Sequence, residues 1–96
     1  MSSGKIDFGE YILHLRTTFG YSQRIVADKL GIDISLLSKI EHGERQIQSH
    51  MLKGIAELFD LDYKQIQIDY LKQKIDDLFG NEPYFNEAII NYVNKE

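Results

Sequence analysis

Apolar residues recur every three or four positions along most of the chain, which is the spacing of amphipathic helices. The first half carries three short apolar stripes, and a glycine that can end a helix follows each of them. Asp7, Ser22 and Asp33 stand where their side chains can cap the first turns. The pattern therefore predicts three consecutive helices with these apolar faces and ends: Phe8, Ile12, Leu15 and Phe19 before Gly20; Val26, Ala27 and Leu30 before Gly31; Leu37 and Ile40 before Gly43.

The second half of the chain predicts three further helices. A fourth stripe covers residues 52–59, and a longer one begins at Asp62 and ends at Gly80, with the spacing of a helix-packing seam. Pro83 suits the first turn of a last helix. Residues 44–48, between the third and fourth stripes, are expected to form a loop. The apolar faces are Leu52, Ile55, Ala56 and Phe59; Ile68, Leu71, Ile75 and Leu78; and Phe85, Ile89, Tyr92 and Val93.

The composition narrows the class of protein. The chain has 96 residues, 43% of them hydrophobic, and no cysteine, which excludes disulfides and thiolate metal sites. No apolar leader follows Met1, and no apolar run reaches membrane-spanning length. We therefore expect an all-α, soluble protein of the cytoplasm, with no metal, no cofactor and no membrane partner.

The net charge of −4 is unevenly distributed. Residues 1–48 contain six Lys/Arg and six Asp/Glu, whereas residues 49–96 contain five and nine, so the whole negative excess lies in the second half. The chain therefore lacks the strongly basic character of many nucleic-acid-binding domains. This counts only mildly against DNA binding, because phosphate contacts need a few cations on one face.

Residues 21–45, YSQRIVADKLGIDISLLSKIEHGER, contain two short predicted helices joined by Gly31-Ile32-Asp33, the proportions of a helix-turn-helix. The segment resembles the helix-turn-helix of the lambda-repressor/Cro-like (XRE) family of bacterial and phage transcriptional regulators. The resemblance covers about residues 8–61. It implies a five-helix lambda-repressor-like DNA-binding domain over residues 1–61, followed by a helical extension over residues 62–96. It rests on Ser22-Gln23, Val26-Ala27, Leu30-Gly31 and Ser38-x-Ile40-Glu41-x-Gly43.

This resemblance also implies a DNA-contacting surface and a structural ion pair. The third helix would enter the major groove, while the start of the second helix and the loop after the third would meet the phosphates. Arg16 and Glu41 match a pair that joins the first helix to the third, and a catalytic role for Glu41 is far less favoured. The residues assigned to DNA are Gln23, Arg24, Ile34, Ser35, Ser38, Lys39 and Arg45.

Several positions depart from the family pattern, among them the loop Arg45-Gln46-Ile47-Gln48, where an Asn-Pro-Ser type sequence is common. Ile34 and Leu36 stand where polar residues are common, and Glu44 replaces a frequent Lys or Arg. Ile34 either reads a thymine methyl group or serves as an anchor against neighbouring side chains or a partner protein. Glu44 would repel phosphate. These departures bear on the strength of non-specific DNA binding and not on the fold.

The function expected from these features is that of a sequence-specific DNA-binding transcriptional regulator that binds a palindromic operator as a dimer. Residues 62–93 are expected to form the dimer, with the alternative that the last helix folds back over the first and fifth helices of its own chain. An enzyme is not expected, because His14, His42 and His50 form no metal-binding pair and no catalytic motif is present. The open alternatives are a protein-interaction module and an antitoxin-like or restriction-modification controller-like regulator.

Overall fold

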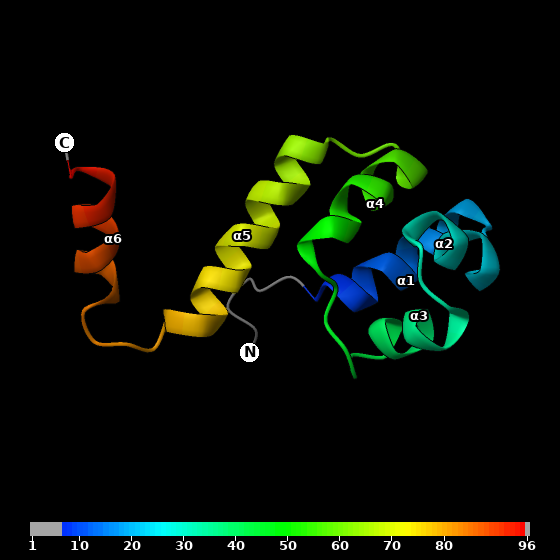
Figure 1. Ribbon diagram of the computed structural model, residues 1–96, viewed down its shortest axis with the longest axis horizontal. Coiled ribbons are helices and arrows are strands. Elements are labelled where there is room, and N and C mark those ends of the chain that lie inside the picture. Colours follow the sequence, from blue (N-terminus) through cyan, green and yellow to red (C-terminus); the bar gives the residue numbers. More distant parts are fainter. Residues whose placement is uncertain (1–6, 96) are drawn as a thin grey trace.

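Over the residues that the structure describes, the protein is built only from helices. The structure is a computed structural model, and it describes residues 7–95 (Figure 1). The elements within this range are α1 (Phe8–Phe19), α2 (Gln23–Leu30), α3 (Ile34–Glu41), the 3-10 helix η1 (Ser49–Met51), α4 (Leu52–Phe59), α5 (Tyr63–Phe79) and α6 (Phe85–Val93). The all-helical class predicted from the sequence is confirmed.

Local signals set the ends of the first helices. The side chains of Asp7, Ser22 and Asp33 accept hydrogen bonds from backbone N–H groups in the first turns, at N···O distances of 3.2, 3.2 and 2.7 Å. Gly20 and Gly31 end α1 and α2 in the left-handed conformation, with φ of 74° and 71°. A side chain would oppose that conformation, so glycine is the residue these helix ends require.

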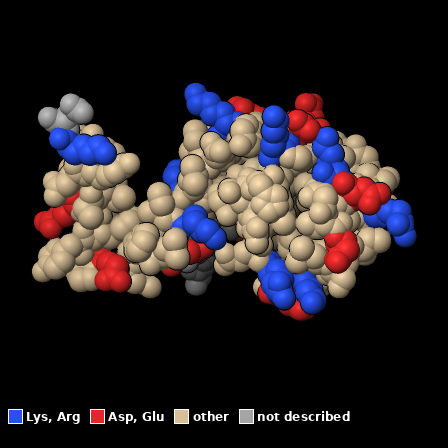
Figure 2. Space-filling view, in the orientation of Figure 1, with Lys and Arg blue, Asp and Glu red and all other residues tan. Residues whose placement is uncertain are grey.

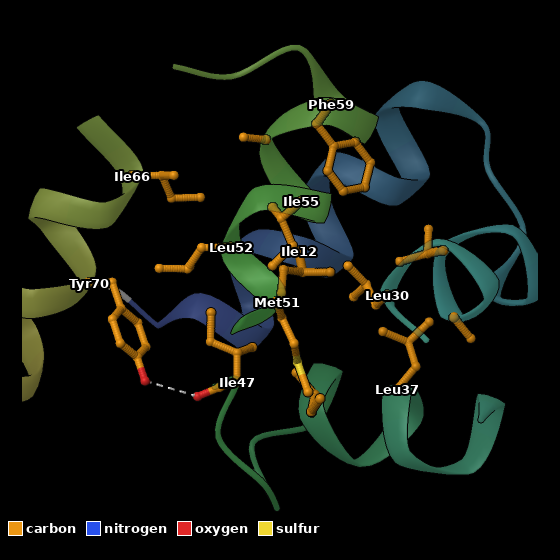
Figure 3. Close-up of a cluster of buried hydrophobic side chains, with 14 residues drawn as sticks. Ile12, Leu30, Leu37, Ile47, Met51, Leu52, Ile55, Phe59, Ile66 and Tyr70 are labelled. Carbon is orange, nitrogen blue, oxygen red and sulfur yellow. Dashed lines mark hydrogen bonds between the residues drawn. The ribbon is translucent and has the colours of Figure 1, made fainter. Parts of the chain in front are cut away.

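A hydrophobic core lies between α1, α2, α3 and α4, and the first half of α5 completes it (Figure 3). The inward residues predicted for α2, α3 and α4 are all buried. Ile47 and Met51, just before α4, enter the core as well, although the sequence pattern singled out neither of them. The buried set is Ile12, Val26, Ala27, Leu30, Leu37, Ile40, Ile47, Met51, Leu52, Ile55, Ala56, Phe59, Ile66 and Tyr70.

Residues of α5 that the sequence assigned to the extension pack into this core. Ile66 is 6% and Tyr70 is 8% exposed, and the Tyr70 hydroxyl donates to the carbonyl oxygen of Ile47 at 3.4 Å (Figure 3). The ring of Phe8 meets that of Tyr70 edge-on, with 5.8 Å between the centroids. The core therefore extends past the expected boundary between residues 61 and 62. The longer apolar stripe that the sequence predicts for this helix lies on its opposite side.

The last helix, α6, lies apart from the rest of the molecule. It begins at Phe85, two residues after Pro83, so the proline precedes the helix instead of lying in its first turn. None of the residues of α6 is buried. Figure 1 shows α6 beyond the C-terminal end of α5, at one end of a molecule that measures 45 × 28 × 21 Å. Over residues 7–95, the structure does not contain the fold-back onto α1 and α5 that the sequence left open.

Gly9 lies where α1 packs closely against α3, and a Cβ at this position would collide with the carbonyl oxygen of Ile40. We predict that Gly9→Ala lowers the free energy of unfolding by ~1–3 kcal/mol, because α1 must shift away from a backbone atom. Urea melting measures the difference. Gly54→Ala is the matched control, since its Cβ would come closest to the tip of the Leu30 side chain, at 3.0 Å, and would lie at an ordinary contact distance of 3.6 Å from the nearest backbone atom, the carbonyl oxygen of Lys29. A Gly9→Ala protein as stable as the wild type would contradict this close approach.

Candidate nucleic-acid interface

Two eight-residue helices, α2 and α3, are joined by a turn of three residues, Gly31 to Asp33. On α2, Leu30 is buried next to this turn. On α3, Leu37 and Ile40 are buried and fix the inner side of the helix to the core. This arrangement holds α3 rigidly along one side and leaves its other side facing solvent.

The outer side of α3 carries polar residues. Ser35 and Lys39 are exposed, and neither side chain makes a hydrogen bond or ion pair with another described residue. Ser38 is half-buried. Because side chains four residues apart share one face of a helix, Ser35 and Lys39 can enter a groove together.

Ile34 and Leu36 have a structural explanation. Both side chains are half-buried and pack against the hydrophobic core. For Ile34, this packing favours the anchoring alternative over the reading of a thymine methyl group. In the family that the sequence resembles, these two positions are commonly polar. Here their apolar side chains hold α3 on the core.

Glu41, the last residue of α3, is buried and fully paired, with 5% of its surface exposed. Arg16 of α1 donates from Nε to Glu41 Oε2 at 2.6 Å and from Nη2 to Glu41 Oε1 at 3.1 Å. The same guanidinium group donates from Nη1 to the carbonyl oxygen of Tyr21 at 3.1 Å. This bidentate pair ties α1, and the turn that follows it, to the end of α3.

Gln23, the first residue of α2, belongs to the same network. Its Nε2 donates to Glu41 Oε1 at 3.1 Å. The family resemblance assigned this side chain to a DNA phosphate, and no pattern in the sequence indicated a contact with Glu41. The contact fixes the start of α2, where the first backbone N–H groups have no partner inside the helix and can bind an anion.

The loop after α3 is held from two sides. The N–H groups of Glu44 and Arg45 donate to the carbonyl oxygen of Lys39, at 2.8 and 3.3 Å. From α5, Lys74 Nζ donates to Gln46 Oε1 at 3.4 Å. A cleft of about 380 Å³ lies between this loop, the start of α1 and α5. The loop backbone is thus held to the end of α3 and the Gln46 side chain to α5, while the Arg45 side chain remains exposed.

Cations lie near α3 without forming a continuous patch. Figure 2 shows Lys and Arg side chains over the loop that follows α3, with acidic groups beside them. The side chains of Arg24 and Arg45 are exposed, and no described residue pairs with either. Lys29 instead forms an ion pair with Glu57 of α4 at 2.8 Å, and its hydrogen bond holds the pKa of Glu57 below the usual value. Lys29 therefore connects α2 to α4.

A family model described as a helix-turn-helix domain matches residues 9–76. The match covers most of the chain and includes α1 to α4 and most of α5, which are the elements that build the core. The chain belongs to the helix-turn-helix domain family. Neither a curated protein nor a solved structure matches the chain. Membership of this family points to DNA as the partner and to a regulatory role.

Residues 7–95 contain neither a metal-ligand cluster nor a membrane-spanning helix. No group of three or more His, Cys, Asp or Glu side chains in this range is placed to hold a metal ion. Of its helices, none is both long enough and apolar enough to cross a membrane.

Arg16→Ala is expected to destabilise the fold, because it leaves the Glu41 carboxylate buried without its cationic partner. The expected loss of unfolding free energy is ~3–5 kcal/mol, measured by urea melting. The double variant Arg16→Met/Glu41→Leu is the control. It removes both charges together and should recover most of the loss. If Arg16→Ala melts like the wild type, the ion pair contributes nothing to the stability of the fold.

Proposed function

We propose that the protein is a sequence-specific DNA-binding transcriptional regulator, in which α1 to α5 form a lambda-repressor-like domain. The observation that carries this proposal is the outer face of α3. The helix is short and anchored on its inner side, and its outward Ser35 and Lys39 are held by no described residue. In a member of the helix-turn-helix domain family, that combination suits a helix whose first turns enter the major groove.

Each proposed contact follows from the placement of its residue. Ser35 and Lys39 read base edges, since a lysine can donate to guanine O6 or N7 and a serine can pair with any base. Ser38 lies at the margin of the outer face of α3 and contributes less to the recognition of bases. Arg24 and Arg45, together with the backbone N–H groups at the start of α2, contact phosphates on either side of the groove. Ile34 is not among the residues proposed to contact bases, because its packing against the core explains an apolar residue at this position.

The regulator acts in the cytoplasm as a dimer on a palindromic operator. One recognition helix reads only a few base pairs, so two copies bind half-sites about one turn of DNA apart, ~34 Å. The exposed apolar residues of the last two helices support dimerisation, because apolar surface of that extent normally marks an interface. No catalytic activity and no cofactor form part of the proposal.

A protein-interaction module is the second candidate, and the exposed apolar side chains of α6 favour it. Salt dependence separates the two functions, because a protein that binds only proteins shows no salt-dependent affinity for DNA. An antitoxin-like or restriction-modification controller-like regulator would combine both, since it would bind its own promoter as well as a partner. Binding to DNA fragments at low salt therefore tests the proposed function directly.

Arg45→Gln should reduce the salt dependence of DNA binding. We expect the slope of log Kobs against log salt to fall in magnitude by about 1, because one phosphate contact is lost. Fluorescence anisotropy with a labelled duplex at several salt concentrations gives the slope. Lys64→Gln, at the start of α5, removes the same charge from a site remote from α3 and should leave the slope unchanged. Equal slopes for wild type and Arg45→Gln would exclude Arg45 from the phosphate contacts.

Lys39→Ala should relax the sequence preference at one base pair of each half-site. The expected cost is ~1–3 kcal/mol on the preferred sequence, with little loss on a duplex already changed at that pair. Arg45→Gln is the comparison, because loss of a phosphate contact weakens binding to all sequences alike. A uniform loss for Lys39→Ala across single-substitution duplexes would assign Lys39 to a phosphate instead.

A further inference from the structure

The long helix α5 has two apolar faces, and residues 7–95 cover only one of them. Ile66 and Tyr70 face the core. A second stripe lies about half a turn away around the helix, on the opposite side. Its members and their exposed fractions are Ile68 at 39%, Leu71 at 46%, Ile75 at 39% and Leu78 at 62%.

The neighbouring helix α6 has an apolar face that the described chain leaves largely uncovered. Ile89 keeps 39% of its surface exposed, and Tyr92 and Val93 keep 66% each. Together with Phe85 and Ala88, these residues fall on one side of the helix, and that side contains no charged residue. Figure 2 shows few charged groups over this end of the molecule.

The uncovered surface is large enough for a stable dimer. The seven large apolar side chains of these two faces have exposed fractions from 39% to 66%, and Phe79, Tyr84 and Ile90 beside them are 52% to 73% exposed. At ~150–250 Å² per large aromatic side chain and less for an aliphatic one, they expose on the order of 1,000 Å² per chain. A specific protein interface of standard size buries ~800 Å² on each partner. A second copy of the chain could therefore bury this surface.

We propose that two copies of the chain exchange their last helices, so that the apolar face of each α6 packs on the outer stripe of its partner's α5. This inference rests on the dimer proposed above and specifies which helices form it. In the exchanged dimer, the apolar face of each α6 covers the outer stripe of the other chain's α5. One two-fold axis relates these two contacts, so the assembly closes at two chains. Dimerisation through α5 alone would leave the apolar face of α6 in solvent.

The position of α6 favours the partner's α5 over its own. Residues 80–84 carry the chain away from α5, and Figure 1 shows α6 set to one side of it. If α6 instead closed on its own α5, both stripes would be buried within one chain and little apolar surface would remain for a dimer. The separation of the two helices leaves both stripes available to a second copy.

Cross-linking between two single-cysteine proteins tests the exchange, because the chain itself contains no cysteine. Leu71→Cys on α5 is mixed with an affinity-tagged Ile89→Cys on α6, and a short bis-maleimide reagent is added. Ile75→Cys replaces Leu71→Cys in a second mixture to allow for the register of the two helices. In the control mixture, Thr18→Cys, which is exposed on α1, replaces the variant with the cysteine on α5. Light scattering on the wild-type chain gives the oligomeric state independently.

Exchange predicts a product that joins a tagged to an untagged chain, formed about 100-fold faster than with Thr18→Cys, because only the α5 and α6 cysteines lie within the span of the short reagent and so have a millimolar effective concentration for each other. The double variant Leu71→Cys/Ile89→Cys should give dimer-sized products. Monomer-sized, internally linked products would overturn the exchange. A dimer by light scattering without an α5–α6 product would also overturn it, while leaving the proposed operator-binding dimer in place. A monomer at high micromolar concentration would overturn both, and DNA binding would still be judged by its salt dependence.

Discussion

The buried carboxylate of Glu41 is the constraint on which the arrangement of the helix-turn-helix depends. A charged group at this depth destabilises the fold by several kcal/mol unless it is paired with good geometry. Its partners come from two other helices, since Arg16 belongs to α1 and Gln23 to α2. All three groups are satisfied together only when α1, α2 and α3 hold one mutual arrangement. The directions of Ser35 and Lys39 follow from that arrangement, because α3 cannot tilt without separating Glu41 from its partners.

The fifth helix connects this surface to the end of the chain. Tyr70 contributes its ring to the core and its hydroxyl to the carbonyl oxygen of Ile47, while Lys74 reaches Gln46 in the same segment. These two contacts from α5 therefore hold the segment that directly follows Arg45. On the other side of the same helix lies the uncovered apolar stripe. The proposed dimer surface and the support of the proposed phosphate-binding loop are thus two sides of one rigid element.

Sequence patterns predicted the local structure well where the cause is local. The caps at Asp7, Ser22 and Asp33 and the glycine ends of α1 and α2 depend on the chemistry of a few adjacent residues, and the structure contains all of them. The pairing of Arg16 with Glu41 came from the family resemblance, and the structure brings these two side chains together. No rule of spacing would have joined residues 25 positions apart.

Features that depend on tertiary packing were harder to predict. Ile66 and Tyr70 form an apolar face of only two buried residues on α5, and the regular seam on the opposite side concealed it. Ile47 is a single apolar residue in a polar segment, so no periodicity marks it as part of the core. The family resemblance assigned Gln23 to a DNA phosphate, whereas its Nε2 donates to a buried carboxylate inside the protein. In each case the partner lies far away in the sequence.

Selection of bound sequences from a random pool of duplex DNA tests the central claim most directly, because every possible operator sequence competes in the same pool. A dimeric helix-turn-helix regulator should enrich one sequence with two-fold symmetry, whose half-sites have centres about 10 base pairs apart or a multiple of that spacing. Failure to enrich any sequence, at low salt and with the folded full-length chain, would contradict the account.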